Sequence, residues 1–211
     1  MTEASSVTTV VVGDRLPWPD DAQQTFESGP FDAAAIYLSG VRRECVIRKI
    51  SALGATVGSD LVPALGDRVA IEIATGQRPA GKVAWTGRSE LGIRFDDSID
   101  VLALLNRQLV SQSRERRTMP RLEVRSTAHF KCGEHFRPAT LRNISSHGLQ
   151  LEGDDLPAVG TYISVFIDGL NVPSGEVAWK RDNLAGIEIF EELSWTSIIP
   201  WIRNAIRKGT N

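Results

Sequence analysis

The chain has few cysteines and no long hydrophobic run, and each shortage removes a class of protein. Its two cysteines, Cys45 and Cys132, have no CxxC partner and no metal-ligand spacing, so we expect free, half-buried thiols. No stretch approaches the ~20 apolar residues that a membrane-spanning helix needs. The short apolar run near the N-terminus follows no basic residues, unlike a secretory signal. We therefore expect a cytoplasmic protein that does not insert into a membrane.

An excess of one charge is also missing. The 24 Lys and Arg residues nearly cancel the 26 Asp and Glu residues, for a net charge of −2. Duplex nucleic acid requires a basic face that displaces counterions, so we expect neither DNA nor RNA as a partner. Aromatic residues, 7% of the chain, are scattered rather than interleaved with basic residues, which disfavours a barrel that binds single strands. A local group of arginines could still bind a small anion: Arg114, Arg116, Arg117, Arg121 and Arg125.

Patterns of a catalytic site are absent from the sequence as well. No His adjoins a nucleophile pattern, and there is neither a metal-ligand cluster nor a phosphate-binding GxxxxGK[ST] loop. The paired carboxylates at 96–97 and 154–155 are interpreted as solvated turn residues. We expect a protein that is not an enzyme and has no cofactor.

What the chain does contain is an internal repeat. Residues 48–93 align with residues 142–187 without a gap, at an offset of 94 (142 − 48). Within this alignment GKVAW at 81–85 falls on GEVAW at 175–179. A period of this length indicates a duplicated domain rather than a solenoid, whose units span ~20–50 residues.

Each copy has the pattern of a small sandwich or barrel followed by a helix. Apolar residues alternate in both, which predicts half-buried strands: Val69, Ile71 and Ile73, then Ile163, Val165 and Ile167. Glycine-containing turns separate the strands. Helical spacing follows in both: Val101, Leu104, Leu105 and Leu109, then Trp195, Ile198, Ile199, Ile202 and Ile206. We expect Asp97 and Ser98 to cap the first helix, and Pro200 to start or kink the second.

The repeat also divides the chain. Residues 1–28 have no partner in the repeat and are rich in Pro, Asp, Ser and Thr, so we expect a flexible or loosely docked N-terminal arm. The first domain is then expected at 29–112 and the second at 113–211, with the first helix leading directly into the arginine group.

Two short motifs in the second copy indicate a function. Arg117 and Arg121 form Arg-x-x-x-Arg, and Asn143, Ser145 and Gly148 form Asn-x-Ser-x-x-Gly about one hairpin later. In this order and spacing the motifs resemble the signature of the PilZ family, bacterial receptor modules for cyclic di-GMP. The resemblance covers roughly residues 114–208. It implies a mainly all-β fold of two tandem PilZ-like six-stranded antiparallel β-barrels, each followed by a C-terminal α-helix.

The chemistry of these residues suits such a ligand. A guanidinium can bind phosphate bidentately, contact guanine O6 and N7, or stack on a base. The resemblance implies that Arg117 and Arg121 close over the ligand and that Asn143 meets the guanine edge, where the family more often has Asp. An arginine at position 116 goes, in the family, with two stacked ligands rather than one. The ligand-binding residues predicted in this way are Arg116, Arg117, Arg121, Asn143, Ser145 and Gly148.

Each motif residue also has a purely structural interpretation. The arginines could form a solvated loop with surface ion pairs, which contribute little. A turn could require Gly148 with or without ligand, and Trp85 and Trp179 are better interpreted as packing residues than as stacking platforms. The first copy has Lys49 where the second has Asn143 and lacks Arg-x-x-x-Arg, so we expect that it binds no ligand.

The sequence therefore predicts a cyclic di-GMP receptor that signals to an unknown downstream protein by a conformational change between the barrels. Control of motility, biofilm or exopolysaccharide is the output that the resemblance implies. The alternative is a PilZ-fold interaction scaffold that does not bind cyclic di-GMP. The sequence leaves open whether the chain forms a homodimer.

Overall fold

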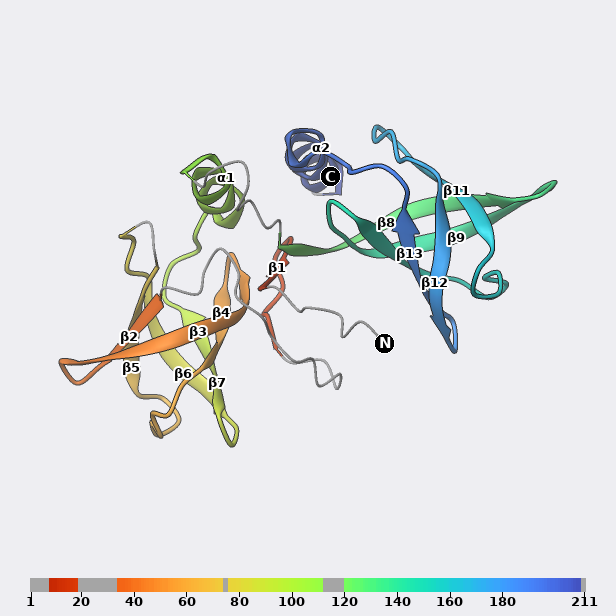
Figure 1. The fold of residues 1–211 in the computed structure, drawn as a ribbon. Helices are drawn as coiled ribbons and strands as arrows, with labels where there is room; N and C mark the ends of the chain where they lie inside the picture. The colour runs from red at the N-terminus through yellow and green to blue at the C-terminus, as the bar shows by residue number, and fades with distance from the viewer. Residues whose placement is uncertain (1–7, 19–33, 74–75, 112–119, 210–211) are drawn as a thin grey trace. The chain divides into compact units, whose positions relative to one another are not determined.

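The computed structural model describes residues 8–18, 34–73, 76–111 and 120–209 (Figure 1). Contacts between residues divide the chain into two units, Met1–Arg121 and Leu122–Asn211. The domain boundary predicted at 112/113 lies outside the described residues. Strands dominate both units, and each unit ends in one described helix.

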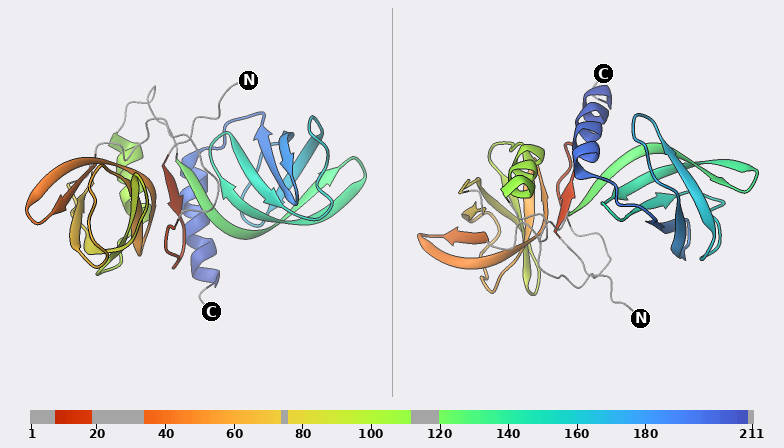
Figure 2. Two further views of the ribbon diagram at one scale, coloured as in Figure 1. Left: turned by 90° about the horizontal axis from the view of Figure 1, so that it is seen from below. Right: turned by 45° about the horizontal axis from the view of Figure 1, so that its top comes forward.

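The second unit is a closed barrel. Its strands are β8 (Arg121–Cys132), β9 (His135–Ile144), β10 (Gly148–Glu152), β11 (Tyr162–Ile167), β12 (Gly175–Arg181) and β13 (Leu184–Ile189). They pair antiparallel in the order β8-β9-β10-β13-β12-β11, and β11 pairs back with β8 (Figures 1 and 2). Inward-facing residues such as Ile163, Val165 and Ile167 are buried, as their alternation predicts. The predicted mainly β fold with a six-stranded antiparallel barrel and a following helix is confirmed.

The helix of this unit, α2 (Trp195–Gly209), begins earlier than the proline suggests. The hydroxyl of Ser194 accepts a hydrogen bond from the Thr196 N–H at 3.3 Å, which caps the first turn. Pro200 therefore lies inside the helix, and the expectation that the helix starts there is wrong. The Trp201 indole donates to the Asp168 carbonyl at 2.8 Å and anchors α2 to the turn after β11.

The first unit repeats this strand order. Its strands are β2 (Ala34–Leu38), β3 (Val41–Ser51), β4 (Gly54–Gly58), β5 (Arg68–Glu72), β6 (Ala80–Thr86) and β7 (Glu90–Phe95), followed by α1 (Val101–Ser111). They pair in the order β3-β2-β5-β6-β7-β4, and β4 pairs with β3. The bounds of β10 and β13 minus 94 are those of β4 and β7 (148 − 94 = 54; 184 − 94 = 90). Loop hydrogen bonds repeat too: Gly66 N to Val83 O and Gly160 N to Val177 O are both 2.8 Å.

The repeated tryptophans have a packing role in both units. Each indole lies so close over a glycine of the neighbouring strand, Trp85 over Gly92 and Trp179 over Gly186, that a Cβ there would overlap the ring. Helix α1 is capped by Asp100, whose Oδ1 accepts the Ala103 N–H at 2.8 Å, and not by Asp97 or Ser98 as predicted. The cap lies closer to the helix because the acceptor must reach an amide of the first turn.

Part of the predicted flexible arm is docked on the first unit. Residues 9–11 form β1 (Thr9–Val11), which pairs in parallel with β3, Thr9 opposite Lys49 and Val10 opposite Ile50. The Thr8 hydroxyl donates to the Ile47 carbonyl at 2.9 Å, and Val10 is fully buried. Of the two expectations for the arm, residues 8–18 follow the docked one, because a β-branched run was available to pair with β3. The remainder of 1–28 lies outside the described residues.

Both cysteines are free, as predicted, with Cys45 buried and Cys132 half-buried. Burial raises the pKa of the Cys45 thiol to about 12 against a smaller opposing effect of Arg42. Among the described residues, no group of His, Cys, Asp or Glu could hold a metal ion. No helix in the described part of the chain has the length and apolar character required to cross a membrane.

We expect Val10→Asp to destabilise the protein. The substitution would bury a carboxylate beside Ile50 with no partner, at a cost of about 3 kcal/mol in the free energy of unfolding. Denaturant unfolding measures this change. Val62→Asp is the matched control, because the Val62 side chain is 94% exposed. Equal unfolding midpoints for the two variants would show that residues 8–18 do not contribute to the packing of the first unit.

Candidate ligand-binding site

A β-bulge turns Asn143, the first residue of the Asn-x-Ser-x-x-Gly motif, towards the outside of the barrel. On β9 and β10, Asn143 lies opposite Gln150 and Leu141 opposite Leu151, so Arg142 has no opposite residue. Leu141 and Ile144 are both fully buried, whereas Arg142 and Asn143 are half-buried. Strict alternation cannot bury two residues three apart, and the extra residue of a bulge permits it. Two adjacent polar side chains are thereby turned outward.

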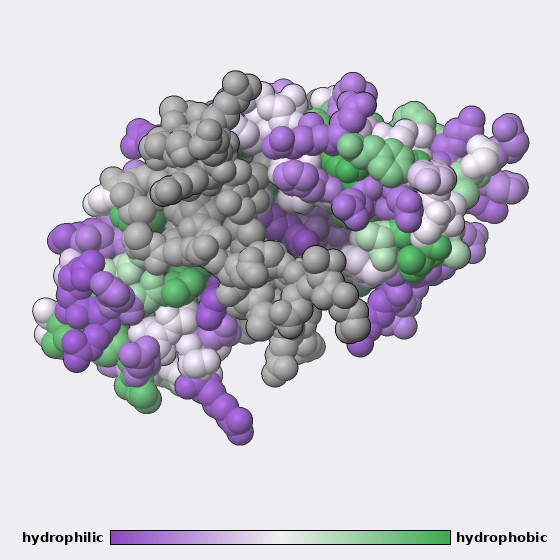
Figure 3. Space-filling model, in the orientation of Figure 1, coloured by the Kyte–Doolittle hydropathy of each residue, from purple (hydrophilic) through white to green (hydrophobic). Residues whose placement is uncertain are grey.

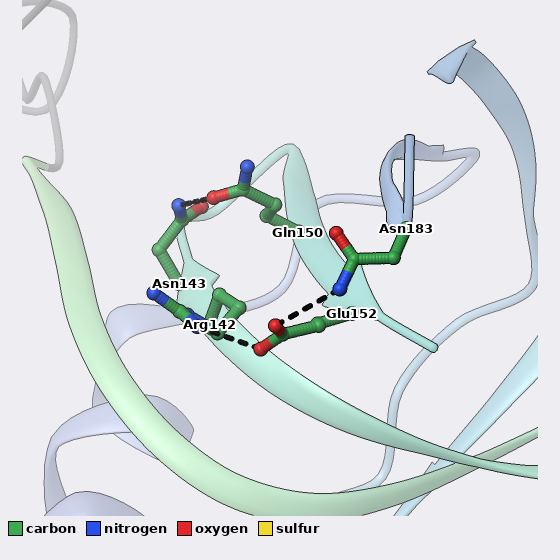
Figure 4. A network of polar contacts seen from close by, with 5 residues as sticks. All are labelled: Arg142, Asn143, Gln150, Glu152 and Asn183. Atoms are coloured by element: carbon green, nitrogen blue, oxygen red, sulfur yellow. Dashed lines mark hydrogen bonds and ion pairs between the residues drawn. The ribbon is translucent and has the colours of Figure 1, made fainter. Parts of the chain in front are cut away.

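Asn143 is paired with the side chain across the ladder. Its Nδ2 donates a hydrogen bond to Oε1 of Gln150, and both side chains leave the same side of β9 and β10 (Figure 4). Neither the Asn143 Oδ1 nor the Gln150 Nε2 bonds to another of the described residues. The pair therefore presents one acceptor and one donor next to each other.

A second network fixes the other bulge residue. Arg142 Nη1 contacts Glu152 Oε2 at 2.6 Å, and Asn183 Nδ2 donates to Glu152 Oε1 at 3.1 Å (Figure 4). The hydrogen bond from Arg142 is the main cause that lowers the pKa of Glu152, with smaller contributions from Asn183 and the charge of Arg125. The carboxylate thus joins β9, β10 and the turn before β13.

The Ser and Gly of the motif close the turn between β9 and β10. The Ser145 amide and hydroxyl both donate to the Gly148 carbonyl, at 2.8 and 3.2 Å. A Cβ on Gly148 would lie 2.5 Å from the Ile187 carbonyl oxygen, so only glycine fits beside β13. The backbone approach that Gly148 permits is therefore that of β13, and its φ is not positive.

The same turn occurs in the first unit without the ligand motif. Ser51 Oγ accepts the Leu53 N–H at 3.1 Å, and a Cβ on Gly54 would overlap the Ile93 carbonyl. Ser and Gly are therefore explained by the turn in both units. The positions that differ are the outward-facing ones, Lys49 in place of Asn143 and Thr56 in place of Gln150.

In the first unit this outer face is covered by the chain itself. Lys49 pairs with Thr9 of β1, and the Thr56 hydroxyl donates to the Pro17 carbonyl. The ring of Trp18 meets that of Trp85 edge-on, with centroids 6.3 Å apart. In the second unit the strand beside Asn143 is instead the start of β8, where Glu123 lies opposite it. In the second unit both Asn143 and Gln150 are half-buried, whereas Thr56, the equivalent of Gln150 in the first unit, is buried.

The predicted arginines are only partly within the described residues. Arg121 is exposed and begins β8, immediately before Leu122. Leu122 pairs with Ile144, the residue between Asn143 and Ser145 in the motif. The structure therefore brings Arg121, Asn143, Ser145 and Gly148 to neighbouring strand ends. Arg116 and Arg117 lie outside the described residues.

Sequence reasoning missed the residues that hold the motif in place. The signal for the bulge was present, since apolar residues three apart flank two polar ones at 141–144 and again at 47–50. Alternation in β10 also predicts that Gln150 faces outward between Leu149 and Leu151. No sequence signal set the register that places Gln150 opposite Asn143, or the contact of Glu152 with Asn183.

A second surface feature lies on β8, β9 and β11. The His129 and Phe136 rings stack with centroids 5.1 Å apart, and Phe136 meets Phe166 at 5.5 Å. Phe136 and Phe166 are 56% and 47% exposed. On the face drawn in Figure 3, hydrophobic residues likewise reach the surface among hydrophilic ones. We call His129, Phe136 and Phe166 the aromatic cluster.

A shallow pocket of about 290 Å³ adjoins these strands. It is lined by Lys131, Gly133, Tyr162, Ile163, Ser164 and Ser174. Since Lys131 and Arg121 lie at opposite ends of β8, the pocket is separate from the motif.

The fold and the motif define the class of this domain: a six-stranded antiparallel barrel with a polar bulge beside the turn between β9 and β10. Among protein-family models, the PilZ domain matches residues 115–199. No curated protein matches the chain by sequence at a significant level.

Solved structures give distant similarities. The PlzA protein of Borreliella burgdorferi, in complex with c-di-GMP, is 11% identical with a TM-score of 0.34 and covers 82% of this chain and 86% of its own. The inhibitor of motility MotI/DgrA of Bacillus subtilis is 12% identical with a TM-score of 0.30, covering 86% and 97%. The K. pneumonia MrkH–c-di-GMP complex is 7% identical with a TM-score of 0.29, covering 84% and 88%.

We expect Gly148→Ala to destabilise the second unit whether or not ligand is present. The new methyl group would press on the Ile187 carbonyl, part of the β13 backbone, at a cost of about 1–3 kcal/mol. Thermal unfolding without ligand measures the loss. Gly153→Ala is the control, because its Cβ would have ordinary contacts of 3.5 Å or more. A Gly148→Ala variant as stable as the Gly153→Ala variant would contradict the tight approach.

We expect Arg142→Met to return the pKa of Glu152 towards its ordinary value, as measured by NMR titration of side-chain carboxyl carbons. The folded-state pKa is the lowered one, so the ion pair stabilises the fold above the unfolded-state pKa. That contribution is lost as the pH falls through the folded-state pKa. Arg137→Met, which removes the exposed contact with Asp155, should leave Glu152 unchanged. A normal Glu152 pKa in the unmodified protein would refute the network.

Proposed function

We propose that the chain is a cytoplasmic, non-enzymatic receptor for cyclic di-GMP that binds the dinucleotide on the second barrel. The observation that carries this proposal is the placement of Arg121 at the start of β8, next to the strand end that bears Asn143. The PilZ match over the same residues supports it. The ligand-binding residues are Arg116, Arg117, Arg121, Asn143, Ser145 and Gly148, of which Ser145 and Gly148 also form the turn.

The chemistry of the second barrel suits this ligand. Cyclic di-GMP has two phosphate charges and two guanines with hydrogen-bonding edges. Arg121 is an exposed guanidinium that can reach a phosphate or a guanine O6 and N7. The half-exposed Asn143 offers its free amide oxygen to the N1–H edge of a guanine. Arg116 and Arg117, which precede β8 in the sequence, would supply two further guanidinium groups to the ligand.

The contrast between the two units supports a single ligand-binding barrel. In the first unit Lys49, a donor without an acceptor, takes the position of Asn143. Its strand partner there is Thr9, and Thr56 bonds to Pro17. The first barrel therefore serves a structural role or an interaction with another protein.

Output through a protein partner is the second part of the proposal. The aromatic cluster gives the second unit an exposed apolar surface of the kind that marks protein–protein contacts. The same cluster favours the alternative, a PilZ-fold interaction scaffold that does not bind cyclic di-GMP. Ligand binding distinguishes the two functions.

We expect isothermal titration calorimetry of cyclic di-GMP into the full chain to give a dissociation constant in the micromolar range or below. Arg121→Ala and Asn143→Ala should each weaken binding by about tenfold or more, since each removes a charged or directional hydrogen bond. Lys49→Ala is the matched control, because it changes the equivalent position of the first barrel and should leave affinity unchanged. The fitted ratio distinguishes one bound ligand from a stacked pair.

Absence of heat at high ligand, together with an unshifted melting temperature, would favour the scaffold. If Lys49→Ala and Asn143→Ala weakened the binding of cyclic di-GMP equally, the site would not be confined to the second barrel.

A further inference from the structure

No other residue in the described part of the chain fixes the direction of the amide pair of Asn143 and Gln150. Its internal hydrogen bond runs from Asn143 Nδ2 to Gln150 Oε1. The two remaining polar atoms, Asn143 Oδ1 and Gln150 Nε2, bond to no other described residue. Both side chains are half-buried and lie on the outer side of β9 and β10 (Figure 4). A base that approaches this face meets an acceptor beside a donor.

That order of atoms matches guanine. Guanine presents the O6 acceptor next to the N1–H donor on its Watson–Crick edge, so Gln150 Nε2 can donate to O6 while Asn143 Oδ1 accepts from N1–H. Adenine presents the reverse order on the same edge, with the N6 amino donor next to the N1 acceptor. A fixed pair would therefore exclude adenine.

The Asn143–Gln150 pair can present its free donor and acceptor in either order. If both amides turn over, Gln150 Nε2 donates to Asn143 Oδ1, and the hydrogen bond between them is retained. The free atoms are then Asn143 Nδ2, a donor, and Gln150 Oε1, an acceptor, in the order that adenine requires. A carboxylate at either position would have no such freedom, because it only accepts.

We propose that the base site at Asn143 and Gln150 accepts adenine as well as guanine. The chain then binds the mixed dinucleotide cyclic GMP–AMP about as tightly as cyclic di-GMP. This inference rests on the proposed function, since it concerns the same site. The arginine forks proposed for the other base donate to O6 and N7 and so favour guanine there. Cyclic di-AMP is consequently the weakest of the three ligands.

The test is calorimetric titration of 3′,5′-linked cyclic di-GMP, cyclic GMP–AMP and cyclic di-AMP into the full chain and into Gln150→Glu. In the variant the new carboxylate must accept from Asn143 Nδ2, so both groups that face the base, Asn143 Oδ1 and the carboxylate, are acceptors. Guanine can meet them with its adjacent N1–H and N2–H donors, whereas the N1 acceptor of adenine would be repelled. We expect the two guanine-containing ligands to differ by less than about fivefold in the unmodified chain and their affinity ratio to rise about tenfold in the variant. The ratio cancels the added negative charge, because both ligands carry two phosphates.

Two further variants keep the outcome clear. Asn143→Asp should also shift the ratio towards guanine, whereas Gln150→Leu should weaken both ligands and leave the ratio near that of the unmodified chain. Binding of cyclic di-GMP with rejection of cyclic GMP–AMP by the unmodified chain would overturn the inference and leave the proposed function intact. The inference would also be overturned if Gln150→Glu left the ratio of the affinities for cyclic di-GMP and cyclic GMP–AMP unchanged. Failure of all three ligands would refute the proposed function, and this inference with it.

Discussion

The burial of Leu141 and Ile144, three residues apart on β9, is the constraint on which the candidate site depends. Regular alternation would expose one of them, and the hydrophobic free energy of burying both is recovered only if the strand bulges between them. The bulge turns Arg142 and Asn143 outward together. Arg142 is then held by Glu152, and Asn143 meets Gln150 at the end of β9, beside the start of β8.

The first unit shows that this constraint belongs to the fold and not to the ligand. Ile47 and Ile50 are buried three residues apart, and the register of β3 and β4 shifts between Ile47 and Lys49. The turn that follows retains its serine and glycine. What differs is the side chains that point outward. In the first unit Thr56 bonds to Pro17 and β1 pairs beside Lys49, whereas the second unit presents its amide pair at these positions. Two units with the same strand order can thus share a buried pattern and differ at the surface.

The strands of both units, the turn glycines and the offset of 94 residues were predictable, because alternation and the internal repeat are local patterns. The pairing of Asn143 with Gln150 was not, because register depends on which distant residues meet across the ladder. The pairing of β1 with β3 could not be predicted for the same reason: its β-branched run indicates a strand but not its partner. Asn143 was found through a family motif, whereas its partner Gln150 required the structure.

The most direct test of a single ligand-binding barrel is residue-resolved NMR of the full chain with cyclic di-GMP. The amides of Asn143 to Gly148 and the side-chain NH2 signals of Asn143 and Gln150 should shift in proportion to bound ligand. The equivalent amides of Lys49 to Gly54 should not move. Shifts at Lys49 to Gly54, or their absence at Asn143 to Gly148, would contradict the account.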